Sequence, residues 1–280
     1  MDDRSEINNT GDYSMSKLSA NSKKVLGEFI GSAFISFWGL GFVIPFAVLG
    51  YVNNMYEFAV WFGIAFAITV IAFAPISGVH VNPGVTLAWS CFGGFDKKLI
   101  LPYWVAQILG WCVGIVPFFF MFDNVFAEWA ATTGGNPATL FYCTTPAENL
   151  LAGAGLEIFL TAMLTFAIFV LLDNRIPNKP SAAGFPWAIG IVISLLIALG
   201  GGFTGTCINP ARDLGPRIAG LIYGLIKGYD VSGIFAGGQW IMYIIAPMIG
   251  AVLGGAFHYG VVVKLLPDAE ESKVAEKKGE

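Results

Sequence analysis

The chain has 280 residues, of which 56% are hydrophobic and only 12% are charged. A soluble domain of this length would need about twice that share of charged residues for its surface. The stretch between Lys98 and Asp123 carries no charge and is long enough to cross a bilayer as a helix. The composition therefore predicts an all-α membrane protein, and the acidic net charge of −4 with no basic patch excludes a nucleic-acid partner.

Both ends of the chain are polar and predict solvated, disordered cytoplasmic tails at 1–22 and 266–280. The first 22 residues contain no apolar run, so we expect no cleavable signal peptide. Four scattered cysteines and two histidines show no ligand spacing, which predicts neither a metal site nor a cofactor. We expect the cysteines to be small buried side chains.

Six apolar stretches are long enough to span about 30 Å of hydrocarbon. They are predicted near 25–48, 57–76, 99–121, 150–172, 184–201 and 238–263. Two further segments, from Ser77 to Phe92 and from Thr204 to Leu221, are too short to span and too apolar for ordinary loops. Each contains an Asn-Pro pair, which marks a helix start inside the membrane.

Lysine and arginine fall on one side of this six-span arrangement, at 23–24, 97–98, 175, 179 and 264. The long loop at 122–149 contains only acidic charges, and Lys227 is the one mild exception on the opposite side. Because cytoplasmic loops carry the excess of basic residues, both termini are predicted to be cytoplasmic.

The two halves of the chain resemble each other. Glu28 and Glu157 occupy matching places in the first and fourth spans, and Asn82 and Asn209 recur at almost the same separation. Three spans per half is an odd number, so the halves have opposite topology and form an inverted repeat. We assign a domain at 23–265 with repeats near 24–121 and 150–264. We expect the two glutamates to accept hydrogen bonds from the short segments, with a proton relay as the alternative.

An Asn-Pro pair suits a helix start, because Asn caps the first turn and Pro lacks the N–H that would stay unpaired there. Two such helices entering from opposite faces would meet with their positive ends at mid-membrane and repel cations. The Asn amides would donate toward passing oxygen atoms, and extended residues before each Asn would expose carbonyl groups to water. This acceptor ladder is predicted at Gly78, Val79, His80, Phe203, Thr204 and Gly205. Such a lining suits neutral hydroxyl-bearing molecules rather than ions.

These motifs resemble those of the aquaporin superfamily, over residues from about 24 to 264. The string at 80–86 resembles the first Asn-Pro-Ala box of that family, with Asn82 and Pro83 followed by Gly84 in place of alanine. The second box is present unchanged as Asn209, Pro210 and Ala211. The resemblance implies an inverted repeat of six transmembrane helices with two re-entrant half-helices, one pore per subunit and a homotetramer.

Four further features resemble the aquaglyceroporin branch, which includes glycerol uptake facilitators. Asp213 follows Arg212, Arg217 lies four positions beyond Asp213, Pro247 precedes Met248, and a loop runs from Phe95 to Lys98. The resemblance implies a channel for glycerol and water, and also for urea, dihydroxyacetone or protonated hydroxy acids. A water-selective aquaporin is the nearest alternative. The glycerol-facilitator resemblance and the lack of a signal peptide suggest a bacterial inner membrane.

The selectivity filter of such a channel has four positions. Counting from the boxes places them at Phe62, Ile197, Thr206 and Arg212, although a slip of one residue would put Trp61 in place of Phe62. An ion-coupled secondary transporter is the rival from another class, since inverted repeats also occur there. No constellation of catalytic groups is present in the sequence, so we expect no enzymatic activity.

Overall fold

The computed structural model describes residues 18–52, 54–144 and 149–266. In these ranges the chain is helical with no strand, and six helices are long and apolar enough to cross a membrane. The predicted fold class is confirmed. The disorder predicted for the tails falls on residues 1–17 and 267–280, which lie outside the described residues, but the first helix already begins at Ala20.

The helices follow the order predicted for two repeats. In the first half they are α1 Ala20–Ile35, α2 Met55–Ser77, α3 Pro83–Phe92 and α4 Ile100–Met121. In the second half they are α6 Leu150–Leu172, α7 Phe185–Thr204, α8 Pro210–Lys227, α9 Gln239–Phe257 and α10 Val263–Leu265. Wider π-helical turns at Ser36–Leu40, Ile44–Val48 and His258–Val262 extend α1 and α9.

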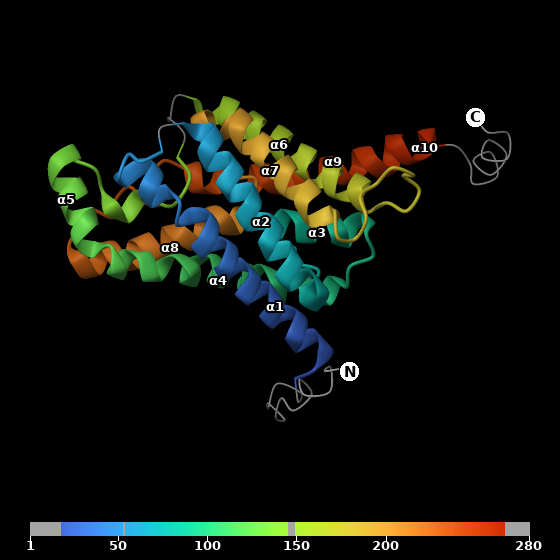
Figure 1. The fold of residues 1–280 in the computed structure, drawn as a ribbon, viewed down its shortest axis with the longest axis horizontal. Coiled ribbons are helices and arrows are strands. Elements are labelled where there is room, and N and C mark those ends of the chain that lie inside the picture. Colours follow the sequence, from blue (N-terminus) through green and yellow to red (C-terminus); the bar gives the residue numbers. More distant parts are fainter. Residues whose placement is uncertain (1–17, 53, 145–148, 267–280) are drawn as a thin grey trace, which may run out of the picture.

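One helix was not predicted. The loop between the halves contains α5, Asp123–Thr133, which lies at one end of the molecule, whereas the start of α1 and α10 lie toward the other end (Figure 1). At the α5 end, Lys227 forms an ion pair with Asp123 at 2.7 Å. The basic residue that was an exception to the orientation pattern therefore lies beside an acid.

Glycines set how closely the spans approach. A Cβ atom on Gly110 of α4 would lie 2.3 Å from the carbonyl oxygen of Phe29 in α1, and one on Gly250 of α9 would lie 2.3 Å from that of Ile158 in α6. Such contacts exclude any side chain, so the helix backbones touch directly, as small residues permit in membranes. The α1–α4 pair and the α6–α9 pair are therefore equivalent crossings in the two repeats.

The crossing between α2 and α7 joins the halves. A Cβ atom on Gly63 would lie 2.4 Å from the carbonyl oxygen of Gly190, and a Cβ atom on Gly190 would lie 2.6 Å from that of Gly63. This reciprocal contact is what a pseudo-two-fold axis between inverted repeats requires. The contact fixes the rotation of α2 and α7 about their own axes. It therefore also decides which of their side chains face the centre of the molecule.

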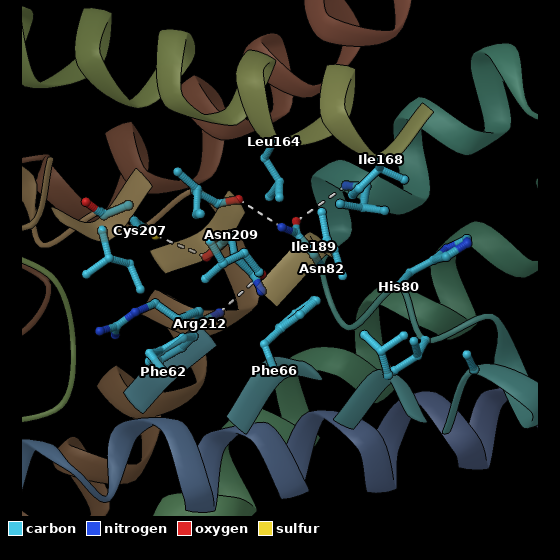
Figure 2. A pocket seen from close by; sticks show the side chains of 18 of the residues that line it. Phe62, Phe66, His80, Asn82, Leu164, Ile168, Ile189, Cys207, Asn209 and Arg212 are labelled. Carbon is cyan, nitrogen blue, oxygen red and sulfur yellow. Dashed lines mark hydrogen bonds between the residues drawn. The ribbon is translucent and has the colours of Figure 1, made fainter. Parts of the chain in front are cut away.

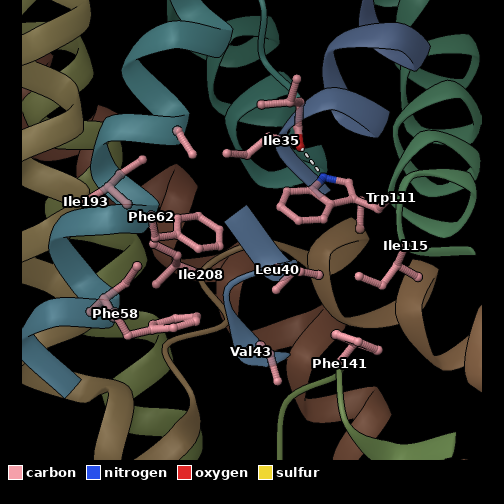
Figure 3. Close-up of a cluster of buried hydrophobic side chains, with 14 of the residues drawn as sticks. Ile35, Leu40, Val43, Phe58, Phe62, Trp111, Ile115, Phe141, Ile193 and Ile208 are labelled. Atoms are coloured by element: carbon pink, nitrogen blue, oxygen red, sulfur yellow. Dashed lines mark hydrogen bonds between the residues drawn. The ribbon is translucent and has the colours of Figure 1, made fainter. Parts of the chain in front are cut away.

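The interior between these helices is apolar and aromatic. Figure 3 shows side chains of α2, α4 and α7 that meet those of the segment before α8, among them Phe58, Phe62, Trp111, Ile193 and Ile208. The Trp111 indole N–H also donates to the carbonyl oxygen of Val81 at 3.0 Å. The apolar core is thus tied by this hydrogen bond to the segment that leads into α3.

We expect Gly63→Ala to destabilise the protein, because the added methyl group must push α2 away from α7. Overpacking of this kind costs about 1–3 kcal/mol. The matched control is Gly155→Ala in α6, where an added Cβ meets no atom within 4 Å. The melting temperature of the purified protein in detergent should fall for the first variant and stay unchanged or rise for the second. Equal behaviour of the two variants would contradict the role assigned to the crossing.

Candidate functional site

Asn82 and Asn209 cap the two short helices. The side-chain oxygen of Asn82 accepts hydrogen bonds from the backbone N–H groups of Gly84 (2.8 Å) and Val85 (3.4 Å). That of Asn209 accepts them from Ala211 (3.0 Å) and Arg212 (3.3 Å). Pro83 and Pro210 take the first helical position in α3 and α8, where a missing N–H costs nothing.

The same two side chains also hold the helices together. The Asn82 amide nitrogen donates to the carbonyl oxygen of Ile208 at 2.8 Å, and that of Asn209 donates to the carbonyl oxygen of Val81 at 2.9 Å. Each amide therefore caps its own helix and crosses to the opposite segment, so the N-terminal ends of α3 and α8 face each other. Since an amide has two donor hydrogens, one on each asparagine is left for the space between them.

The residues before each asparagine have an unusual, alternating backbone. Gly78, Val79 and Val81 have φ angles of 86°, 49° and 45°, and Gly205, Thr206 and Ile208 have 72°, 44° and 43°. Four of these residues are β-branched, for which a positive φ is strained by about 1–3 kcal/mol each. Because non-helical backbone at membrane depth must find other partners, this strain has to be held by the surroundings.

Two buried carboxylates supply that support. Glu28 accepts the backbone N–H groups of His80 (2.9 Å) and Val81 (2.7 Å) and the hydroxyl of Ser77 (2.7 Å). Gln107 completes its shell at 2.8 Å.

Glu157 repeats the pattern in the second half. It accepts the N–H groups of Cys207 (2.9 Å) and Ile208 (2.7 Å) and the hydroxyl of Thr204 (2.6 Å). Both carboxylates are fully buried. Apart from the bond from Gln107, these hydrogen bonds of Glu28 and Glu157 all come from the segments that lead into α3 and α8.

A cavity of about 470 Å³ runs past the two asparagines. Its walls differ in polarity. Apolar side chains of α2, α6 and α7 form one wall, including Phe62, Phe66, Val70, Leu164, Ile193 and Ile197. The two short segments and the start of α8 form the other, with His80, Asn82, Thr206, Cys207, Asn209 and Arg212. Figure 2 shows Asn82 and Asn209 near the middle, with Arg212 and His80 to either side.

The structure brings the four predicted filter residues to this cavity: Phe62, Ile197, Thr206 and Arg212 all line it. Arg212 is buried, and one of its terminal nitrogens donates to the carbonyl oxygen of Phe141 at 2.8 Å. The Thr206 hydroxyl donates to the carbonyl oxygen of Leu196 at 3.3 Å. The guanidinium is therefore the main charged group on this side of the asparagines.

The alternative of Trp61 at the filter does not fit the geometry. Trp61 is 37% exposed, stacks on Phe42 with ring centroids 4.5 Å apart, and donates to the carbonyl oxygen of Trp38 at 2.8 Å. Phe62 is 7% exposed and lies on the cavity wall.

Two residues predicted for the acceptor ladder are placed elsewhere. We expected Phe203 and Thr204 to be extended, but both belong to α7, which ends at Thr204. The Phe203 side chain is 71% exposed, and the Thr204 carbonyl accepts a hydrogen bond from Tyr243 at 2.7 Å. Gly205, Thr206 and Cys207 line the cavity instead. The sequence could have predicted this placement, because the alignment of the two halves matches Gly78 to His80 with Gly205 to Cys207.

Asp213 and Arg217 lie behind the filter rather than in the cavity. Their side chains form a buried ion pair at 2.6 Å. Asp213 accepts the backbone N–H of Cys143 at 2.9 Å, and Arg217 donates to the Cys143 carbonyl at 2.8 Å. The pair therefore fastens the loop before α6 onto α8.

A carboxylate follows the last residue of α6 that lines the cavity. Leu172 and Phe185 line the cavity at the end away from the filter, and Asp173 comes directly after Leu172. Asp173 forms hydrogen bonds with Arg175 and with His258, at 2.7 and 2.8 Å. The hydrogen bonds from Arg175 hold the pKa of Asp173 well below its usual value. This carboxylate thus stays charged, and it ties the end of α6 to the extension of α9.

Comparison with known proteins agrees with this geometry. The model of the family described as Major intrinsic protein matches residues 15–259. The glycerol uptake facilitator protein of Haemophilus influenzae is 34% identical over 248 residues, which are 84% of this chain and 91% of that protein. The propanediol uptake facilitator of Citrobacter freundii is 32% identical over 86% of this chain and 94% of that protein.

Among solved structures, the aquaglyceroporin from Plasmodium falciparum superimposes with a TM-score of 0.77 at 26% identity. The similarity covers 88% of this chain and 98% of that one. The chain belongs to the major intrinsic protein family, and it is an integral membrane protein.

We expect Glu28→Gln to destabilise the protein and lower its activity. The amide keeps one acceptor oxygen where two backbone N–H groups and a hydroxyl now converge, and an unsatisfied buried donor costs about 1–3 kcal/mol. The melting temperature in detergent should fall accordingly. Glu128→Gln, on the exposed face of α5, is the control and should leave the melting temperature unchanged. Equal melting temperatures for both variants would contradict the role of Glu28 in supporting the segment before α3.

Proposed function

We propose that the chain is a passive channel for glycerol and other small uncharged solutes, including water. The observation that supports this most directly is the meeting of two capped helix N-termini beside a continuous cavity. Two positive helix ends, and the guanidinium of Arg212 to one side of them, oppose cations along the cavity. A neutral molecule meets no such barrier, since its hydroxyl groups can exchange water for the donors and acceptors of the wall.

The two-sided lining favours solutes with an apolar edge and a polar edge. In this proposal Asn82, Asn209 and Arg212 donate to solute oxygens, while the backbone carbonyls of Gly78, Val79, His80, Gly205 and Thr206 accept from solute hydroxyl groups. Phe62 and Ile197 contact the carbon chain. A polyol fits this pattern better than a strictly polar molecule, and the relatives named for glycerol and propanediol uptake support the same class. By the same pattern, urea, dihydroxyacetone and protonated hydroxy acids are candidate solutes.

The remaining parts of the proposal concern location and assembly. The basic residues at 23–24, 97–98, 175, 179 and 264 favour cytoplasmic termini. The bacterial glycerol facilitators among the relatives favour a bacterial inner membrane. Large apolar side chains remain exposed along the spans, for example Ile64 and Ile68 on α2 and Leu195 and Leu199 on α7. Such faces suit lipid and the contacts of a homotetramer, with one pore in each subunit.

The function is tested by stopped-flow light scattering on proteoliposomes. We expect glycerol and water to equilibrate faster than in empty liposomes made from the same lipid. A proton or sodium gradient should produce no accumulation of glycerol, because a channel can only equilibrate its solute. Glycerol permeability equal to that of empty liposomes would refute the channel, and uphill accumulation would favour the coupled transporter.

The filter assignment is tested with two neighbouring aromatic residues. Phe62→Ala should raise the permeability to a five-carbon polyol relative to glycerol by about tenfold, which corresponds to about 1.4 kcal/mol of barrier. Trp61→Ala removes a similar ring from the outer face of α2 and should leave this ratio unchanged. If the tryptophan variant shifts the ratio instead, the helix is rotated from the orientation described above.

A further inference from the structure

The filter has a counterpart on the other side of the two asparagines. Gly63 and Gly190, which contact each other across the axis between the halves, are separated by the same number of residues as Asn82 and Asn209. This constant separation relates each residue of α2, of α3 and of the segment between them to an equivalent in the second half. For the four filter residues, the equivalents are Val70, Val79, Val85 and Ile189.

These four residues line the same cavity, and we call them the apolar ring. Their side chains are buried, with exposed fractions of 6% or less. Phe62 and Val70 lie two turns apart on α2, about 12 Å along the helix, so the filter and the ring are separate positions. Figure 2 shows Ile189 toward His80, and Phe62 toward Arg212.

The ring and the filter differ in the hydrogen bonds that they offer. Where the filter has the guanidinium of Arg212, the ring has Val85, so the ring side chains donate nothing to the oxygen atoms of a solute. The polar groups at the ring are backbone carbonyls of the segment before α3, which only accept. His80 also lines the cavity on this side, but its Nδ1 bonds with Thr86 at 3.2 Å and its ring stacks on Trp89 with centroids 6.1 Å apart.

We infer that the apolar ring is a second selectivity site, which favours diols with a methyl edge, such as 1,2-propanediol, over glycerol. The inference rests on the proposed function and names a finer preference within its solute class. A solute hydroxyl can donate to a carbonyl at the ring, but its oxygen accepts from no ring side chain, so the barrier rises with the number of hydroxyl groups. A methyl group contacts valine and isoleucine without this cost.

The preference does not depend on size. Three of the four ring side chains are smaller than their equivalents in the filter, among them Val85 in place of Arg212 and Ile189 in place of Phe62. A solute that has passed the filter therefore has room at the ring. What it loses there is donors for its oxygen atoms.

The hydroxyl that Val85→Thr adds finds the nearby backbone acceptors already occupied. The carbonyl of Val81, one turn back, accepts hydrogen bonds from Trp111 at 3.0 Å and from Asn209 at 2.9 Å. The carbonyl of Asn82 accepts two hydrogen bonds as well. The added hydroxyl is therefore left to donate to a solute in the cavity, with almost no change in side-chain volume.

The test is stopped-flow light scattering on proteoliposomes with glycerol and with 1,2-propanediol, after subtraction of the flux through empty liposomes. We expect Val85→Thr to raise glycerol permeability relative to that of 1,2-propanediol by about threefold, the effect of one added hydrogen bond on a barrier. Val70→Thr adds a hydroxyl on the α2 side of the ring and should change the ratio in the same direction. It decides the test if the first variant does not fold.

Two controls separate hydrogen bonding from other effects. Val60→Thr makes the same exchange on the outer face of α2, where Val60 is 55% exposed, and should leave the ratio unchanged. Ile189→Val widens the ring without adding a polar group and should also leave it unchanged.

An unchanged ratio in the folded threonine variants of the ring would overturn the inference. An equal shift of the ratio in Ile189→Val would overturn it too, since the ring would then select on size. A wild-type protein that conducts neither solute contradicts the proposed function instead, and the wild-type measurement separates these results.

Discussion

Two buried carboxylates, Glu28 and Glu157, hold the backbone on which the rest of this structure depends. Each accepts two consecutive N–H groups from a segment whose alternate residues have positive φ angles. Without such acceptors, these N–H groups would be unpaired on the side of each segment that faces the protein interior. Because the N–H groups turn toward the glutamates, the carbonyl groups between them are free to face the cavity. The strain is local, and its support comes from helices far away in the sequence.

The inverted repeat explains why the support occurs twice. The crossings at Gly110 and Gly250 place α1 against α4 and α6 against α9 in the same way, so the two glutamates reach equivalent positions. The reciprocal contact of Gly63 with Gly190 then joins the halves across one axis. The amides of Asn82 and Asn209 bond across that axis as well. One symmetric set of contacts therefore aligns both helix ends with a single cavity.

The cavity has an apolar wall and a polar wall that face each other along its length. Phe62, Ile193 and Ile197 belong to an apolar wall, whereas Asn82, Asn209 and Arg212 lie on the polar one. Apolar contacts favour carbon chains without requiring a fixed orientation, while the hydrogen-bonding groups replace the water that a hydroxyl loses. The loop around Cys143 supports the polar wall from outside the cavity. Asp213 and Arg217 of α8 bind the backbone of Cys143, and the Phe141 carbonyl accepts a hydrogen bond from Arg212.

By itself, the sequence determined the six spans, the inverted repeat and the two helix starts at Asn82 and Asn209, because length, hydropathy and capping are local properties. It did not determine which face of each span is turned inward. The span α2 is apolar on all sides, and each residue along a helix turns the side chain by about 100°. Only tertiary contacts could therefore choose Phe62 over Trp61, extend α7 through Phe203, and bring the Cys143 backbone to Asp213 and Arg217.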